Sequence, residues 1–202
     1  MLKLYCFPRS GNSREVKIVL AEKNLSFQAV DIKAPGFDRE DPEFKKASPK
    51  AKVPAIVDGE VYMSEAYEIN EYLDKKYTKN PLMPKDETAC KTIRDWVAAH
   101  DKKFVLKIGL LVIETLLKPK DQQNEETKAK LRAEITEGMK ELDRMLEGKP
   151  FLFGDYSLAD VSVTPHIAAL PILGSGVPGE FKNLTAWFKR IQERPSFKQS
   201  TQ

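Results

Sequence analysis

The chain has 202 residues and a formal net charge of +3, because 33 lysines and arginines nearly balance 30 aspartates and glutamates. This length suits one or two domains with a sizeable core, and the even mixture of charges argues against nucleic-acid binding. The start of the chain resembles a strand rather than a signal sequence, and the longest apolar stretch, 108–113, is too short to cross a membrane. Two cysteines without a CxxC pattern favour a reduced, cytoplasmic protein.

The first part of the chain predicts a strand at 2–7, a turn at 8–12, a helix at 13–23 and a strand at 25–32. Asn24 can stop the helix at its C-terminus. A β-α-β order favours two parallel strands joined by a right-handed crossover. Pro35-Gly36 then marks a loop, and 42–47 predicts a short helix.

The stretch 53–77 predicts a strand, a turn, a second strand and a helix. Apolar residues 53–57 precede the turn dipeptide Asp58-Gly59, and 60–63 can pair back on them. Ser64 stands where a helix N-cap is expected. Helical spacing then follows at Ile69, Tyr72, Leu73 and Tyr77.

Two features of this stretch suggest a ligand with an amine and a carboxylate. Val53-Pro54 is a candidate cis bond, which would turn the Val53 backbone outward to pair with an extended peptide. The nearby helix start offers free N–H groups and a positive dipole end to a carboxylate, and Glu65 offers a negative charge to an amine. Together these groups would suit an α-amino-acid end.

Beyond a linker at 79–84, only helical patterns remain. Asp86 can cap a long helix that ends near Pro119, and a second apolar stripe runs from Leu131 to Leu146. Ser157 and Asp160 form a capping box for a helix that Pro171 bends or ends. Residues 184–193 predict a last amphipathic helix.

The stretch 53–73 resembles the glutathione-binding half of the cytosolic glutathione transferases. The family pattern is Val-Pro-x-Leu, Asp-Gly, an acid-Ser pair, Ala-Ile and Tyr-Leu. This chain has Val53-Pro54-Ala55-Ile56, Asp58-Gly59, Glu65-Ala66, Glu68-Ile69 and Tyr72-Leu73. Aligned on Ile69 and Tyr72, the family's serine falls on Ala66, and Ser64 lies two residues too early to replace it. The resemblance extends more weakly over nearly the whole chain and is closest to serine-type theta, zeta and phi-like bacterial members.

The resemblance implies a thioredoxin-like α/β domain at 1–78, a linker at 79–84 and an all-helical domain at 85–202. It implies glutathione as cosubstrate, a small hydrophobic electrophile bound between the domains, a homodimer and a role in detoxification. The expected activity is conjugation of glutathione to the electrophile. Two alternatives stay open: a glutathione-dependent isomerase of the maleylacetoacetate type, and a non-catalytic binding or regulatory protein. The isomerases usually show Arg-Ser-Ser-Cys where this chain has Arg9-Ser10-Gly11-Asn12.

Ser10 falls at the position of the family's activating hydroxyl, counted back from the helix pattern at 16–20. A hydroxyl that donates to sulfur, beside the positive end of a helix, favours thiolate over thiol. Without the resemblance, Ser10 would be read as a turn or N-cap residue. Tyr5 competes as a phenol donor and Cys6 as a nucleophile, although residues of these types inside a strand usually serve packing.

The resemblance assigns glutathione binding to Lys52, Val53, Pro54, Glu65 and Ala66. Val53 and Pro54 would hold the cysteinyl part through the backbone, and Lys52 would face the glycine carboxylate. Glu65 would lie near the α-amine. Ala66 lacks the usual hydroxyl, so the γ-glutamyl carboxylate loses one donor while the Ala66 backbone N–H remains. The expectation is weakened rather than abolished binding.

His100 and His166 lack a second ligand at metal-binding spacing, so no metal is expected. His100 shares a predicted helix face with Trp96 and Phe104, which is compatible with core packing or with a wall of the second-substrate pocket.

Overall fold

The structure is a computed structural model of the chain, and residues 1–32 and 40–200 are described. The chain forms two compact units, one containing Met1–Met83 and Glu193–Gln202, the other Pro84–Gln192. Residues 193–200 therefore group with the first unit, whereas the sequence predicted them as part of the helical domain. The predicted loop at Pro35-Gly36 lies outside the described residues.

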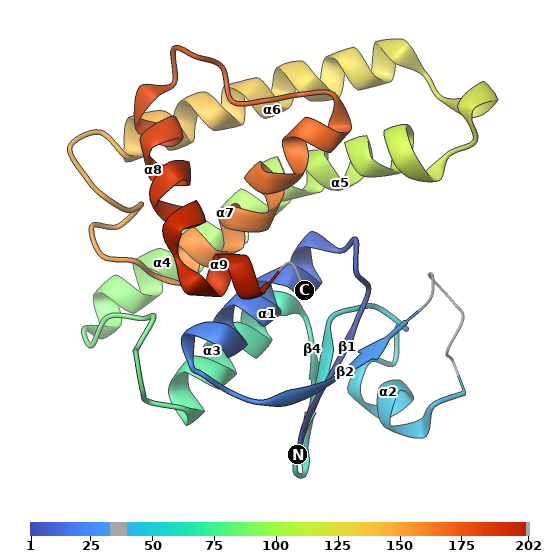
Figure 1. Cartoon of the computed structure of the whole chain (residues 1–202), viewed down its shortest axis with the longest axis vertical. Helices are drawn as coiled ribbons and strands as arrows, with labels where there is room; N and C mark the ends of the chain where they lie inside the picture. Colours follow the sequence, from blue (N-terminus) through green and yellow to red (C-terminus); the bar gives the residue numbers. More distant parts are fainter. Residues whose placement is uncertain (33–39, 201–202) are drawn as a thin grey trace. The chain divides into compact units, whose positions relative to one another are not determined.

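The first unit is a four-stranded mixed sheet flanked by helices (Figure 1). Its strands are β1 (Leu2–Cys6), β2 (Phe27–Asp31), β3 (Ala55–Asp58) and β4 (Val61–Ser64), in the order β2-β1-β3-β4. Its helices are α1 (Gly11–Glu22), α2 (Pro42–Ala47), α3 (Ala66–Lys76) and α9 (Pro195–Gln199). β1 and β2 are parallel, whereas β3 runs antiparallel to both β1 and β4. The expected thioredoxin-like layout is confirmed.

The sheet has an apolar core on each face. On one face, Tyr5 packs its ring against Phe44 of α2, with ring centroids 5.2 Å apart. On the other face lie α1 and α3 (Figure 1), whose fully buried residues include Val16, Val19, Leu20, Ile69 and Leu73. The helical spacing that predicted α1 is thus the spacing of its buried residues, whereas in α3 only Ile69 and Leu73 of the predicted stripe are buried. The half-buried Tyr72 and Tyr77 instead donate their hydroxyls to Asp58, at 3.0 and 2.9 Å.

Helix α1 also holds the C-terminal helix α9. Glu22 accepts two hydrogen bonds from Arg194, at 2.8 and 3.0 Å, and one from the Ser196 hydroxyl. One end of α9 is thereby fixed by a bidentate ion pair. Near the other end, Arg14 donates Nε–H to the Ser200 hydroxyl at 3.0 Å, and its guanidinium lies over the Phe197 ring.

A buried ion pair fixes the segment that leaves the first unit. The Lys23 ammonium and the Asp74 carboxylate are 2.5 Å apart, and their side chains are 0% and 6% exposed. Lys23 also donates to the carbonyls of Lys79 and Asn80, at 3.1 and 2.8 Å. Asp74 accepts the Leu82 N–H at 2.7 Å. The Asn80 side chain also donates to the Glu22 carbonyl at 3.0 Å, so four hydrogen bonds join the predicted linker to the end of α1 and to α3.

The second unit is helical. Its main helices are α4 (Glu87–His100), α5 (Leu106–Val112), α6 (Glu125–Met145), α7 (Leu158–Ala169) and α8 (Lys182–Glu193). Two π-helical turns, η1 (Asp101–Val105) and η2 (Ile113–Leu117), flank α5 and make one long helix of 87–117. Short 3₁₀ turns are η3 (Lys120–Gln122) and η4 (Leu170–Leu173). Asp86 caps α4, as predicted, with its carboxylate 2.7 Å from the Ala89 N–H.

The capping box at the start of α7 is also confirmed. Asp160 is fully buried and accepts hydrogen bonds from the backbone of Leu152 and Ser157, the Ser157 hydroxyl and the Trp187 indole N–H. One carboxylate thus joins the start of α7 to the preceding loop and to α8. Burial raises the pKa of Asp160 to about 6, and these donors act in the opposite direction. None of the described helices is both long and apolar enough to span a membrane.

Candidate functional site

The predicted site residues come from segments that meet at one end of the sheet. Tyr5 of β1 pairs with Ala55 of β3, and Ala55 pairs with Ser64 of β4. These three residues form a row across adjacent strands. The segment with Ser10 leaves this row, the Val53-Pro54 bond enters it, and Glu65 follows it directly.

Ser10 is the N-cap of α1. Its hydroxyl oxygen accepts the Ser13 N–H at 3.2 Å, and its carbonyl accepts the Arg14 N–H at 3.0 Å. Because the oxygen acts as acceptor in the cap, its proton stays available to a neighbouring anion. The first turn of α1 contains no acidic residue, so no carboxylate in that turn offsets the positive end of the helix. Ser10 can therefore act as the N-cap of α1 and still offer its hydroxyl proton to a thiolate.

Tyr5 and Cys6 are 1% and 0% exposed. The Tyr5 hydroxyl donates to Asp41 at 3.1 Å and lies 3.4 Å from Glu43. Burial and these two carboxylates raise the pKa of Tyr5 above its ordinary value. Burial, assisted by the Asp31 carboxylate 3.5 Å from the sulfur, raises the pKa of the Cys6 thiol to about 11. The side chains of Tyr5 and Cys6 are thus both buried in the interior of the first unit. Their burial favours Ser10 among the three candidates for the activating residue.

The Val53-Pro54 bond is cis, as expected. Among the described residues, the Val53 backbone N–H and C=O make no hydrogen bond. Val53 packs partly into the core beside Tyr5, whereas Pro54 is buried. The Lys52 side chain is exposed, and its backbone N–H donates to the Ser48 hydroxyl at 2.9 Å.

The start of α3 differs from the prediction by one residue. Ser64 is not the N-cap, because it is the last residue of β4 and pairs with Ala55 in the sheet. Glu65 takes the N-cap position with φ 74° and ψ 119°, a backbone conformation that costs a non-glycine residue on the order of 1–3 kcal/mol. Its side chain is exposed and makes no capping hydrogen bond, so the N–H groups that begin α3 at Ala66 lack a side-chain cap.

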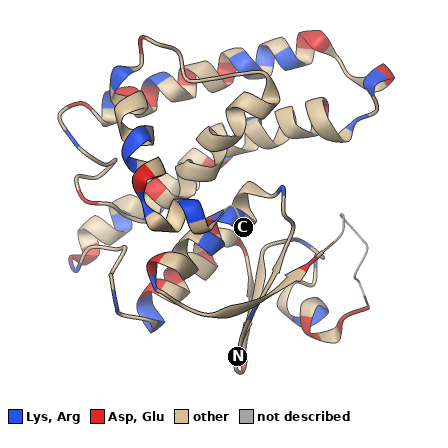
Figure 2. Ribbon diagram, viewed as in Figure 1, with Lys and Arg blue, Asp and Glu red and all other residues tan. Residues whose placement is uncertain are grey.

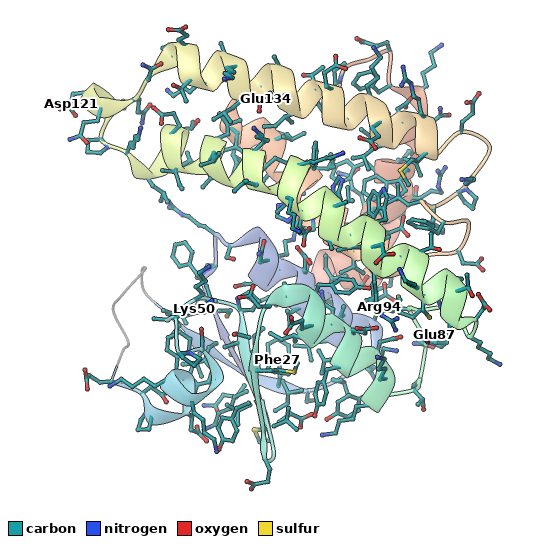
Figure 3. All side chains as sticks on the ribbon, turned by 180° about the vertical axis from the view of Figure 1, so that it is seen from behind. Phe27, Lys50, Glu87, Arg94, Asp121 and Glu134 are labelled. Atoms are coloured by element: carbon teal, nitrogen blue, oxygen red, sulfur yellow. The ribbon has the colours of Figure 1, made fainter. Side chains whose placement is uncertain are left out.

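Lys52 belongs to a group of lysines whose other members were not singled out from the sequence. The exposed members are Lys45, Lys46, Lys50 and Lys52, four cations within eight residues (Lys50 is labelled in Figure 3). Lys45 pairs with Glu40 at 3.3 Å, and the Lys46 ammonium lies 3.7 Å from the centre of the Tyr62 ring. Their density along the chain was the available signal, and it would favour the approach of an anionic ligand.

The two histidines belong to the second unit. His100 stacks between Trp96 and Phe104, with ring centroids 4.6 and 4.8 Å apart. Burial, with a smaller contribution from His166, lowers the pKa of His100 to about 3, and burial lowers that of His166 to about 4. Over the part of the chain that the structure describes, no three His, Cys, Asp or Glu side chains are grouped to hold a metal ion.

Family models match both units. The model described as "Glutathione S-transferase, N-terminal domain" matches residues 4–81, and the one described as "Glutathione S-transferase, C-terminal domain" matches residues 106–195. The chain belongs to the glutathione S-transferase family. The α/β fold of the first unit and the helical fold of the second agree with this membership.

The relatives that the chain matches differ in name. The chain is 31% identical to Glutathione S-transferase Z1 of Arabidopsis thaliana, over 82% of this chain and 76% of the relative. It is 30% identical to a Stringent starvation protein A homolog of Coxiella burnetii, over 99% and 91% of the two chains. Its fold is that of the theta class enzyme of Xanthomonas axonopodis pv. citri solved with glutathione bound, with a TM-score of 0.89, 19% identity and coverage of 99% and 96%.

Proposed function

We propose that this family member binds glutathione on its first unit and transfers it to a small hydrophobic electrophile, with Ser10 stabilising the thiolate. The observation that carries the proposal is the shared sheet end, where the N-terminus of α1, the open Val53 backbone and the uncapped N-terminus of α3 come together. These groups offer a hydroxyl, an extended backbone partner and a carboxylate site.

The proposed chemistry requires little from the protein beyond pKa control and positioning. A free thiol has a pKa of about 8.5. A hydrogen bond from the Ser10 hydroxyl and the positive end of α1 both favour the thiolate. The thiolate sulfur then forms a bond to an electrophilic carbon, and the displaced group leaves with the electron pair of the broken bond.

Recognition of the tripeptide would be divided among the other candidates. Val53 would pair with the cysteinyl backbone, while Lys52 and the neighbouring lysines would face the glycine carboxylate. The Ala66 N–H would bind the γ-glutamyl carboxylate, and Glu65 would attract the α-amine. The strained backbone of Glu65 supports a binding role for this residue, since such conformations concentrate at ligand sites.

A calorimetric titration of glutathione into wild type and Ser10→Ala tests the proposal. We expect similar dissociation constants, and less thiolate by ultraviolet absorbance in the variant at the same pH. Absence of binding by wild type at millimolar glutathione would contradict it. An unchanged thiolate fraction in Ser10→Ala would remove Ser10 from the mechanism.

Ala66 allows a complementary gain-of-function test. A hydrogen bond to a charged group contributes about 1.5–3 kcal/mol, so Ala66→Ser should tighten glutathione binding by about tenfold or more. Ala66 is 7% exposed, and α3 lacks a side-chain cap. Ala66→Gly is the control, because it changes the same position without adding a hydrogen-bond donor. Equal affinity of Ala66→Ser and wild type would show that this hydroxyl is irrelevant here.

A non-catalytic binding protein is the second candidate. It is favoured by Ala66 and by the relative named Stringent starvation protein A homolog, whose name is not that of a transferase. Retention on immobilised glutathione, followed by a conjugation assay, separates the two functions. The isomerase alternative is less well supported, because this chain has Gly11 and Asn12 where isomerases of that type usually show Ser-Cys. A cytoplasmic homodimer with a detoxification role remains part of the proposal, and sedimentation tests the dimer.

A further inference from the structure

The Tyr5 hydroxyl joins strand β1 to the start of α2. The ring is buried against Phe44, and the hydroxyl donates to one oxygen of Asp41 at 3.1 Å. The other oxygen of Asp41 caps α2, because it accepts the N–H groups of Glu43 and Phe44 at 2.9 and 3.0 Å. Burial and the nearby carboxylates raise the pKa of Tyr5, so the phenol keeps the proton that it donates. One carboxylate therefore connects the cap of α2 to β1.

The other end of α2 leads directly into residues 48–52, which we call the lysine turn. Ser48 is the C-cap of α2 and is 2% exposed, and its hydroxyl accepts the Lys52 N–H at 2.9 Å. Val53 is held separately, because it packs against the core of the sheet and β3 begins two residues later at Ala55. The lysine turn, by contrast, takes its position from α2.

The lysine turn carries positive charge that other residues do not neutralise. Lys50 and Lys52 are exposed, and neither has an ion-pair partner among the described residues. On α2 itself both signs of charge lie close together (Figure 2), and Lys45 pairs with Glu40. A hollow of about 540 Å³ is lined by the lysine turn and by the end of α2. The turn thus offers both space and free cations to a carboxylate.

We propose that Tyr5 is a positioning residue that, through Asp41 and α2, holds the lysine turn in place for the glycine carboxylate of glutathione. Tyr5 thereby sets the preference for glutathione over γ-glutamylcysteine, which lacks the glycine. The inference rests on the proposed function and deepens it, because it gives Tyr5 a part in recognition and none in activation of the thiol. Apparent affinity falls with the fraction of molecules whose binding groups are in place, so a loosened α2 weakens the glycine end.

A purely structural role for Tyr5 predicts a different result. Loss of the hydroxyl would then lower stability and leave the preference between the two ligands unchanged. Tyr77 supplies the matched comparison, because its hydroxyl also donates to a carboxylate of the first unit, that of Asp58, at 2.9 Å. Tyr77 lies at the C-terminal end of α3 and is not bonded to α2.

Titration calorimetry of the full chain with glutathione and with γ-glutamylcysteine tests the proposal in wild type, Tyr5→Phe and Tyr77→Phe. Phenylalanine keeps the ring against Phe44, so the core stays filled. Tyr5→Phe should bind glutathione about threefold more weakly or worse and bind γ-glutamylcysteine as wild type does. Tyr77→Phe should keep the wild-type preference. The same preference in Tyr5→Phe and wild type would overturn this inference alone, whereas no glutathione binding by wild type would overturn the proposed function as well.

Three further measurements follow the connection from Tyr5 to the ligand. The Lys52 amide should lose hydrogen-exchange protection in Tyr5→Phe and not in Tyr77→Phe. Asp41→Asn keeps an oxygen for the cap, and the double variant with Tyr5→Phe should bind glutathione no more weakly than either single variant. The thiolate fraction of bound glutathione should stay at the wild-type level in Tyr5→Phe. Unchanged protection of Lys52, additive losses in the double variant or a lower thiolate fraction would each refute the proposal.

Discussion

Asp74→Asn is expected to destabilise the first unit by about 3 kcal/mol. The Lys23–Asp74 pair is almost completely buried, and removing one partner of a buried pair costs about 3–5 kcal/mol. Asparagine keeps an oxygen for the Leu82 N–H, and Lys23 keeps the carbonyls of Lys79 and Asn80. The substitution therefore removes mainly the countercharge, which places the effect at the lower end of the range.

The assay must report on the first unit. The two tryptophans, Trp96 and Trp187, belong to the second unit, so their fluorescence follows the wrong part of the chain. Hydrogen exchange of the Leu82 amide is direct, and its protection should fall about a hundredfold if this amide exchanges through opening of the unit. Urea unfolding followed by far-ultraviolet circular dichroism gives the corresponding free energy.

Lys75→Gln provides a control on the same helix. Lys75 pairs with Glu71 one turn away at 3.3 Å, and the side chains of Lys75 and Glu71 are 66% and 18% exposed. Pairs of this i,i+4 kind on a helix contribute about 0.3–0.5 kcal/mol. If Asp74→Asn proved as mild as Lys75→Gln, the idea that Lys23 depends on a buried countercharge would be refuted.

Three further outcomes follow from the packing and the pKa shifts. Gly138→Ala should lower the melting temperature, because its Cβ overlaps the Phe104 ring, and an unchanged melting temperature would mean that the ring moves aside freely. Since burial lowers the pKa of His100 to about 3 while an unfolded histidine has about 6.5, the unfolded state takes up the proton as the pH falls. Between pH 7 and 5 wild type should lose about 2 kcal/mol of unfolding free energy that His100→Phe retains, and parallel urea curves for the two proteins would contradict this. The Cys6 thiol, whose pKa burial raises to about 11, should react with a disulfide reagent at pH 7.5 only after denaturant is added, and rapid labelling of the native protein at Cys6 would count against its burial.

Local patterns were sufficient for most elements of the fold. The Asp58-Gly59 turn joins β3 and β4 with Gly59 at φ 65°, and α2 covers Pro42–Ala47 as predicted. These elements depend on turn chemistry, capping and periodicity within a few residues. The short helix α9 was not predicted, because its five residues show no periodicity and it is held by contacts with α1. The π-helical turns η1 and η2 were also missed, since nothing in a local pattern distinguishes them from α-helix.

The candidate site was accessible from the sequence only through its motifs. Val53-Pro54 identified the cis bond, and Ser10 was found at a helix cap. The prediction of Ser64 as the N-cap of α3 was wrong, because Ser64 pairs with Ala55 in the sheet and this pairing is not visible in the local sequence. The strained backbone of Glu65 and the burial of Tyr5 against Asp41 depend on tertiary contacts that no spacing reveals. Lys23 and Asp74 are 51 residues apart and carry no local signal that they meet.

The return of α9 to the first unit has a consequence for synthesis of the chain. Glu22 and its partner Arg194 are separated by 172 residues. On the ribosome, the polypeptide of the second unit is therefore made before the first unit can acquire its last helix. Topologically, the helical unit is an insertion in the α/β unit, entered after Met83 and left before Glu193. Until translation has passed Arg194 and Ser196, the Glu22 carboxylate lacks these two partners.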